Sequence, residues 1–240
     1  MSRLSIMTLF SICIPTYEMS GYGPKMLRGL LDNLKSQTIQ DFEIVISDQS
    51  EDLETYKVCE EYHDVHTIKY IKNFYANGRS AHNLNTCLDS STGKIIKVMF
   101  EDDYFLDNDS LKKIAEKYDE GHKWVMNSFT HTQDDKNFFN YMTPTLNDHL
   151  LDGVNTMGNP SNLSFLRSHK QYFDEDLLYL VDCEYYYRMN LLYGSPGVVD
   201  DTLVAIRYHE SSATMNPEFI SKKDVEINYC ANKYYDILES

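Results

Sequence analysis

The chain is poor in cysteine, glycine and proline, the residues that build disulfide scaffolds, zinc sites and flexible linkers. Its 240 residues include five cysteines, ten glycines and six prolines. The cysteine count is odd and no pair has C-x-x-C spacing, so neither a disulfide framework nor a zinc site is indicated, and a reducing compartment fits best. No linker-like tract or solenoid repeat is visible. We therefore expect a single domain, two small domains being the alternative at this length.

Excess positive charge and long apolar runs are absent as well. Acidic residues outnumber basic ones 37 to 22, which gives a net charge of −15. This balance provides no general attraction to nucleic acid or anionic lipid. No apolar run reaches the roughly 20 residues of a membrane-spanning helix, and the apolar start carries no secretory cleavage signature. We expect a cytoplasmic protein without a transmembrane segment, free or peripheral to a membrane, that binds no nucleic acid.

What the first half does contain is a regular alternation of short apolar runs and helix-patterned segments. Such alternation with short loops predicts an α/β fold, with a mostly parallel, Rossmann-like central sheet and helices on both faces. Strands are expected at 9–17, 42–50, 66–73, 94–100 and 123–132, and helices at 24–38, 52–64, 78–93 and 107–121.

The second half is less regular. Residues 141–166 have the pattern of loops and short elements, with a strand near 162–167. A helix is expected at 182–194, with Asp182 as its N-cap. A strand or hairpin follows at 197–214. The C-terminal helix, 216–238, carries an apolar stripe that predicts packing on the rest of the chain or on a second subunit.

Polar residues follow directly after the predicted strands. They are Thr16 and Tyr17, Asp48, Asn73 and the three acids of 101–103. Because ligands bind at the carboxyl ends of strands in parallel sheets, we expect these residues to cluster. The acids follow the buried run Val98–Phe100, and carboxylate oxygens are what Mg²⁺ and Mn²⁺ prefer. The alternative is a set of solvated acids that lead into a helix.

Six segments stand out in chain order between roughly residues 9 and 214: SICIPTY, FEIVISDQS, NGRSAHNLN, MFEDDYFLDNDSL, LVDCEYYYRM and AIRYHESSAT. Together they resemble the inverting family 2 glycosyltransferases of GT-A fold. The resemblance implies a metal-dependent enzyme that moves a sugar from a nucleotide-diphosphate donor, most often a UDP-sugar, to a hydroxyl of a glycan or glycolipid with inversion.

The same resemblance divides the chain. It implies a GT-A domain over residues 1–215, with a nucleotide-sugar-binding half at 9–105 and an acceptor-binding half at 106–215. Residues 216–240 are then a C-terminal helical extension, through which a homo-oligomer would form if its stripe packs on a second subunit.

The resemblance also implies a donor and metal site. Asp48 would accept a hydrogen bond from the imide N–H of uracil or thymine, and Mn²⁺ or Mg²⁺ would neutralise the diphosphate. Asp103 would bind the metal and Asp102 the ribose, but Glu101 alters the usual Asp-x-Asp and leaves open which carboxylate contacts the metal. A surface histidine is the alternative for His209. The implied donor contacts are Pro15, Thr16, Tyr17, Asp48, Asn77, Arg79 and Asp102, and the implied metal ligands are Asp103, Glu101 and His209.

Asp182 is the residue that the resemblance marks as the general base. The usual Glu-Asp pair is Val181-Asp182 here, so the second acid is retained. Inverting transfer needs one base for the acceptor hydroxyl, with Glu184 as the alternative. Two rival functions are a catalytically inactive GT-A-like binding module and a sugar nucleotidyltransferase. The second is disfavoured because the loop PTYEMSGYGPKM has a single lysine to cradle a triphosphate.

Overall fold

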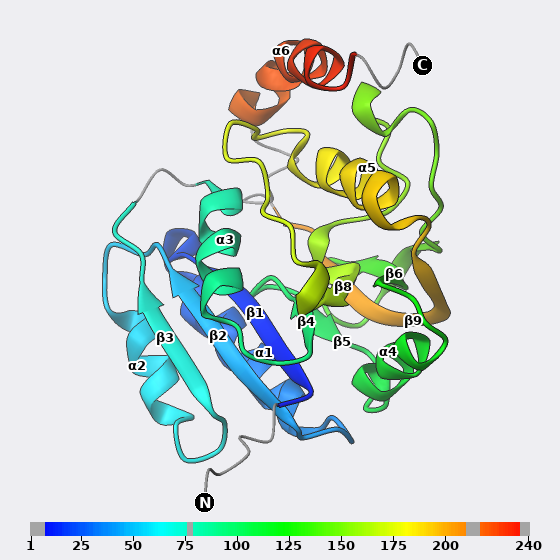
Figure 1. Cartoon of the computed structure of the whole chain (residues 1–240). Helices are drawn as coiled ribbons and strands as arrows, with labels where there is room; N and C mark the ends of the chain where they lie inside the picture. The colour runs from blue at the N-terminus through cyan, green and yellow to red at the C-terminus, as the bar shows by residue number, and fades with distance from the viewer. Residues whose placement is uncertain (1–7, 76–78, 210–216, 236–240) are drawn as a thin grey trace, which may run out of the picture.

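A computed structural model describes residues 8–75, 79–209 and 217–235 of the chain (Figure 1). Its centre is one nine-stranded sheet, with strand order β3-β2-β1-β4-β8-β6-β9-β5 and β7 paired to β6. The strands are β1 Phe10–Thr16, β2 Phe42–Asp48, β3 Ile68–Lys72, β4 Ile95–Val98, β5 Tyr104–Phe105, β6 Trp124–Thr132, β7 Phe138–Met142, β8 Leu163–Leu166 and β9 Gly197–Arg207. The helices are α1 Gly23–Lys35, α2 Glu54–Glu61, α3 Ser80–Ser90, α4 Ser110–Asp119, α5 Val181–Tyr193 and α6 Pro217–Lys233, with short 3₁₀ turns at η1 Met19–Gly21, η2 Leu150–Asp152, η3 Pro160–Asn162 and η4 Arg167–His169.

The first half forms the predicted parallel sheet. β1 pairs in parallel with β2 and with β4, and β2 pairs in parallel with β3. Along β1, Ile12 and Ile14 face a core made with α1, α2 and α4, whereas Cys13 faces a second core made with α3, α5 and α6. Both faces of the sheet are therefore covered, and this explains why strands such as β1 are largely apolar runs buried at every position rather than alternating ones.

The second half adds the antiparallel part of the sheet. β8 runs antiparallel to β4 and β6, and β5 runs antiparallel to β9, while β6 and β9 are parallel. β7, an edge strand paired with β6, was not predicted. Its residues are largely exposed, so its sequence lacks the alternation that a half-buried strand shows.

The cysteines and the surface charge agree with the composition. All five cysteines are buried and none forms a disulfide.

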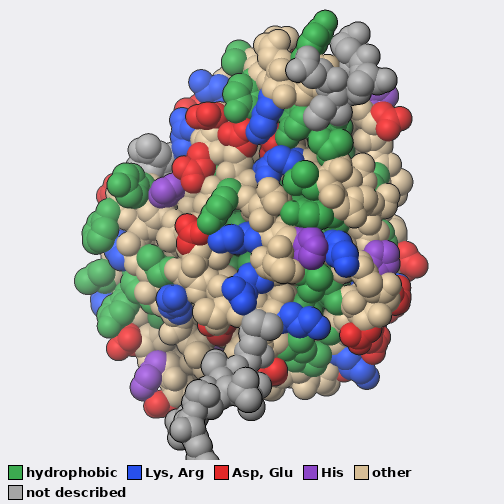
Figure 2. Space-filling view, in the orientation of Figure 1, with side chains coloured by type: hydrophobic (Ala, Val, Ile, Leu, Met, Phe, Trp, Pro, Cys, Tyr) green, Lys and Arg blue, Asp and Glu red, His purple; other side chains and the backbone are tan. Residues whose placement is uncertain are grey.

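On the face seen in Figure 2, Lys and Arg side chains lie among acidic ones, so the net charge of −15 does not produce a continuous acidic surface there. Within the described residues, no helix has both the length and the apolar character needed to cross a membrane.

The C-terminal helix packs on the chain's own domain, beside α5 (Figure 1). Its Lys233 and the following Tyr234 both bond to Glu184 of α5, which is fully buried. Arg188, one turn further along α5, pairs with both oxygens of the same carboxylate at 2.9 and 3.0 Å. Burial opposes ionisation of Glu184, yet the hydrogen bond and charge of Arg188 hold its pKa below the ordinary value. The network therefore fixes α6 to α5.

Replacing Glu184 by alanine is expected to lower the free energy of unfolding by about 3 kcal/mol, because the substitution leaves Arg188 and Lys233 without their buried partner. Glu116→Ala, at an exposed position in α4, is the matched control and should change stability by less than about 0.5 kcal/mol. Urea denaturation of both variants measures the difference. Equal midpoints would show that the network contributes nothing to stability.

Candidate active site

The carboxyl ends of β1, β2 and β4 bring the predicted polar residues together. Thr16 and Asp48 face each other in the register of β1 and β2. The amide of Asn73 donates to the carbonyl of Asp48 at 2.8 Å. The amide of Tyr17 donates to Glu101 Oε1 at 2.9 Å, which joins the end of β1 to the end of β4. The cluster expected from the strand ends is therefore present.

The turn after β1 holds Tyr17 at the surface. The side chain of Tyr17 is 43% exposed, whereas Pro15 and Thr16 are buried in the strand. Gly23, the first residue of α1, allows the chain to fold back at this point, since a Cβ there would lie 2.1 Å from the carbonyl oxygen of Tyr17. A side chain at position 23 would push this turn away from the acids, so the glycine keeps Tyr17 at the site.

Asp48 is completely buried and already has protein partners on both oxygens. Oδ1 accepts from the amide of Ser50 at 2.9 Å and the hydroxyl of Thr16 at 3.3 Å. Oδ2 accepts from the Tyr70 hydroxyl at 2.6 Å and from Lys72 Nζ at 3.4 Å. In this arrangement Asp48 lies beneath the site surface, and its predicted contact with a nucleotide base stays a prediction.

The three consecutive acids differ sharply in their surroundings. Glu101 and Asp103 are 2% and 1% exposed. Asp103 accepts from Asn159 Nδ2 at 2.9 Å and from the amide of Arg207 at 3.1 Å, so both its oxygens are engaged. Burial, with the charge of Asp102, raises the pKa of Asp103 to about 7. Glu101 Oε2 is buried with no hydrogen-bond partner among the described residues, and burial raises the pKa of this carboxyl well above its usual range.

Asp102, in contrast, keeps its side chain partly exposed. Its Oδ2 lies 2.9 Å from His209 Nε2, and the two side chains retain 20% and 27% of their exposure. The hydrogen bond to Asp102 raises the pKa of His209. Asp102 and His209, which the sequence places 107 residues apart, thus form one pair at the edge of the site.

Asp102 and His209 supply two side chains that can act as ligands for a divalent cation, fewer than a full coordination shell. Over residues 8–75, 79–209 and 217–235, no three His, Cys, Asp or Glu side chains are grouped to hold a metal ion. A carboxylate and an imidazole are acceptable ligands for Mn²⁺, and cations bound with nucleotides complete their shell with phosphate oxygens and water. The chemistry of Asp102 and His209 therefore fits a cation that is shared with a diphosphate.

A lysine that the sequence interpretation overlooked lies behind the acids. Lys97 is the one basic residue within β4 and is fully buried. Its Nζ donates to the carbonyl of Ser161, and the carbonyl of Leu163 is 3.5 Å away. Burial lowers the pKa of Lys97 to about 7, against the opposing effect of Asp103. A lysine inside an apolar strand run is the sequence signal that could have drawn attention to this buried side chain.

Arg207, also not assigned a role from the sequence, ties the acids to the β6–β7 turn. Its Nη1 donates to the carbonyl of Asp102 at 2.6 Å, and its guanidinium makes a bidentate pair with Asp135 at 2.7 and 3.1 Å. The guanidinium carbon lies 4.4 Å from the ring centroid of Tyr104. The backbone amide of Arg207 also donates to the carboxylate of Asp103. Arg207 therefore contacts the backbone of Asp102 and the side chain of Asp103.

Arg79 lies at the entrance to α3, where it contacts the second half of the chain. Its Nη1 donates to the carbonyl of Glu175 at 2.7 Å, and His82 Nδ1 is 3.0 Å from the carboxylate of Glu175. These residues, with Tyr75 and Asp176, line a cavity of about 330 Å³. Asn77 lies outside the described residues, so its predicted donor contact has no structural counterpart here.

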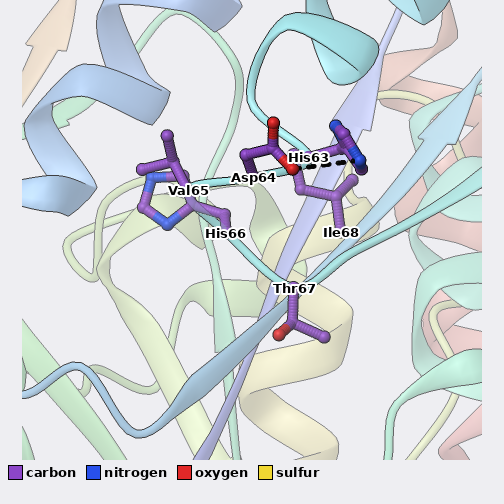
Figure 3. Close-up of a pocket in the computed structure, with 6 residues that line it drawn as sticks. All are labelled: His63, Asp64, Val65, His66, Thr67 and Ile68. Carbon is purple, nitrogen blue, oxygen red and sulfur yellow. Dashed lines mark ion pairs between the residues drawn. The ribbon is translucent and has the colours of Figure 1, made fainter.

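A second hollow, of about 420 Å³, lies away from the carboxyl ends of the strands (Figure 3). Six consecutive residues, 63–68, line it, and its only ion pair joins His63 to Asp64 at 3.2 Å among the residues drawn. This segment precedes and enters the amino end of β3, whereas the polar cluster occupies the carboxyl ends. It is therefore not part of the candidate site.

Asp182 is linked to the acids by a single loop. It is the second residue of α5, which begins at Val181 with Leu180 in the cap position, so the predicted N-cap role of Asp182 is wrong. Its Oδ2 accepts from Asn155 Nδ2 at 3.2 Å, and Asn159 of the same loop donates to Asp103. Burial raises the pKa of Asp182 to about 6. The two asparagines, which carry no pattern of their own in sequence, connect the candidate base to the acid cluster.

Glu184 is not placed to act as the alternative base. Its side chain has no exposed surface, and Arg188, Lys233 and Tyr234 occupy its oxygens. An acceptor hydroxyl cannot reach a carboxylate in this position. Asp182 is consequently the partly exposed acid at the start of α5.

Comparison with solved structures shows the fold. The chain resembles S. aureus TarS 1–349 in complex with UDP-GlcNAc, with a TM-score of 0.70 and 18% identity over 95% of this chain and 73% of that one. It also resembles the mannosyltransferase PcManGT from Pyrobaculum calidifontis in complex with GDP-Man and Mn²⁺, with a TM-score of 0.60 and 17% identity over 85% and 57% of the two chains. Against a longer TarS structure the chain spans 37% of the other's length, at 20% identity and a TM-score of 0.67. These likenesses establish the GT-A fold that the sequence predicted.

Comparison of the sequence identifies the family. No match was found among curated proteins. Residues 11–188, most of the chain, match the profile described as Glycosyl transferase family 2. With the GT-A fold and the polar cluster at the strand ends, this match confirms the resemblance predicted from the six segments: the chain belongs to glycosyl transferase family 2.

Proposed function

We propose that this transferase moves a sugar from a UDP-sugar to a hydroxyl of a glycan or glycolipid acceptor, with inversion and with Asp182 as the general base. The observation that carries the proposal is the loop of Asn155 and Asn159, which bonds to Asp182 on one side and to Asp103 on the other. It sets an acceptor-side base beside a donor-side acid cluster. The S. aureus TarS structure in complex with UDP-GlcNAc supports the choice of uridine nucleotide.

On the donor side, the exposed ring of Tyr17 and the buried Thr16 and Pro15 form the wall for the base. Asp102 and His209 would hold a divalent cation, which when bound neutralises charge on the diphosphate. The geometry favours Asp102 over Asp103 as the ligand because both oxygens of Asp103 already have protein donors. Asp103 then orients Arg207, and Glu101 holds the turn at Tyr17.

On the acceptor side, Asp182 accepts the proton of the acceptor hydroxyl while that oxygen attacks the anomeric carbon. The new carbon–oxygen bond forms on the face opposite the departing UDP, and the bond between the anomeric carbon and the diphosphate oxygen breaks with its electron pair leaving on UDP. The anomeric configuration is therefore inverted. Asn155, which donates to Asp182, holds the carboxylate in orientation before the acceptor binds.

Nucleotide binding tests the donor class. Thermal unfolding with UDP, GDP, dTDP and CMP, each with and without Mn²⁺, should show a shift for UDP that requires the metal. A ligand at a hundred times its Kd stabilises the folded state by about 2.7 kcal/mol, which is easily measured. A shift for GDP instead would change the donor class. No shift for any nucleotide would contradict the enzyme proposal and favour a non-catalytic binding module.

The pH dependence of turnover tests the base. Asp182 must be ionised to accept a proton, and its pKa is raised to about 6. We expect kcat/KM for UDP-GlcNAc to rise about tenfold per pH unit below pH 6 and to level above it, because the ionised fraction grows in that way. The opposite slope, or a profile that is flat across this range, would contradict a carboxylate base at this position.

A further inference from the structure

Glu226 of α6 makes an unusual contact with the entrance to α5. Its side chain is buried, with 5% exposure. Its carboxylate accepts hydrogen bonds from three successive backbone N–H groups. The amide of Leu178 donates to Oε1 at 2.9 Å, and the amides of Tyr179 and Leu180 donate to Oε2 at 2.8 and 2.9 Å. Three consecutive N–H groups around one carboxylate form an anion nest, here filled from a helix 46 residues further along the chain.

This contact acts where α5 begins. Leu180 occupies the cap position, and its side chain provides no capping hydrogen bond. Its carbonyl accepts the amide of Glu184 at 2.9 Å, which closes the first helical turn. Asp182 lies within that turn. Because hydrogen bonds to a charged carboxylate are the stronger kind, the position of the residues before Asp182 depends on Glu226.

The rest of α6 is anchored to the same helix. Lys233 bonds to Glu184 at 2.9 Å, one turn after the start of α5, and to Asp174 at 2.6 Å. Figure 1 shows α6 lying beside α5. Two attachments, at Glu226 and at Lys233, therefore fix α6 relative to the first turns of α5.

We infer that Glu226 is a positioning residue for sugar transfer, which acts through the backbone of residues 178–180 to hold Asp182 at the acceptor. The inference rests on the proposed role of Asp182 as the base. It makes the C-terminal helix part of the active-site apparatus rather than only a cover for the core. A group held in the wrong place by about 1 Å loses roughly a hundredfold in rate, so the expected effect is on kcat.

The test is the steady-state release of UDP from UDP-GlcNAc by the full chain, expressed per folded molecule. Glu226→Gln keeps the size of the side chain but directs an amide group at the three N–H donors. We expect kcat to fall about a hundredfold with the KM for UDP-GlcNAc unchanged. Hydrogen exchange of the amides of residues 178–180 should become faster. Asp224→Asn, an exposed acid on the same helix, is the matched control and should leave both measurements unchanged.

Glu226→Asp is a second variant, to be used if Glu226→Gln does not fold. It keeps the negative charge but its side chain is shorter by one methylene. We expect an intermediate kcat. A kcat within about twofold of wild type in either folded variant, with faster exchange at 178–180, would show a purely structural contact and overturn the inference. Asp182→Asn measured alongside separates the two proposals. If that variant keeps wild-type turnover, or if the wild type releases no UDP, the proposed base fails and the role of Glu226 fails with it.

Discussion

Replacing Asp182 by asparagine is expected to lower kcat for sugar transfer by about 10³-fold, or about 4 kcal/mol in the activation barrier. The amide keeps the size of the side chain and its contact with Asn155, but it cannot accept the acceptor proton. The KM for UDP-GlcNAc should stay within about twofold, since in the proposed function Asp182 contacts the acceptor hydroxyl rather than UDP. Initial rates with and without acceptor measure both quantities.

Asp200→Asn provides the control for this change. Asp200 is exposed on β9, so the substitution alters the charge equally without touching the site. Its kinetics should match those of the wild type. Retained activity in Asp182→Asn, at a stability equal to that of the control, would exclude Asp182 as the base and would leave no exposed acid at the start of α5 to take its place.

Replacing Asp102 by asparagine is expected to remove the metal dependence of UDP binding and to lower kcat by about 10²-fold to 10³-fold. The reason is that the partly exposed carboxylate paired with His209 is lost, and with it the charge that would hold a cation on the diphosphate. The stabilisation of the wild type by UDP with Mn²⁺ should disappear in the variant. Calorimetric titration of UDP with Mn²⁺, or with a chelator, measures it.

The chelator gives this experiment an internal check. In the wild type, chelation should reduce UDP binding to the level of Asp102→Asn, and it should have no further effect on the variant. Asp119→Asn, exposed at the end of α4, serves as the charge-matched control. A variant Asp103→Asn that loses metal dependence while Asp102→Asn keeps it would reverse the assignment of the two acids.

Much of the fold was determined by the sequence alone. Runs such as FSICIPT are largely apolar without strict alternation, and this pattern indicates a strand covered on both faces. The acids of 101–103 follow such a run, so their place at the carboxyl edge of the sheet was predictable. The same logic failed for β7, since an edge strand without a buried face has no burial pattern for the sequence to record.

The tertiary structure decided which of the predicted residues face the site. The sequence pattern indicates that a residue is polar and where its strand ends. It does not indicate which residues from other parts of the chain form hydrogen bonds with it. Asp48 was expected to contact the base and Asp103 the metal, and both contacts stay predictions. The structure adds that the donors Tyr70, Asn159 and Arg207 bond to their oxygens. Glu184, the alternative to Asp182 as the base, is covered by Lys233 and Tyr234.

The sequence by itself therefore determined the parallel half of the sheet, the family and the edge of the sheet at which the polar residues gather, because strand patterning and strand-end position are local properties. Only the tertiary structure decided the connections across that edge. Asn155 reaches Asp182 from 27 residues away, His209 reaches Asp102 from 107, and Glu226 reaches the start of α5 from 46. Such contacts depend on how the elements pack, and no spacing in the sequence encodes them.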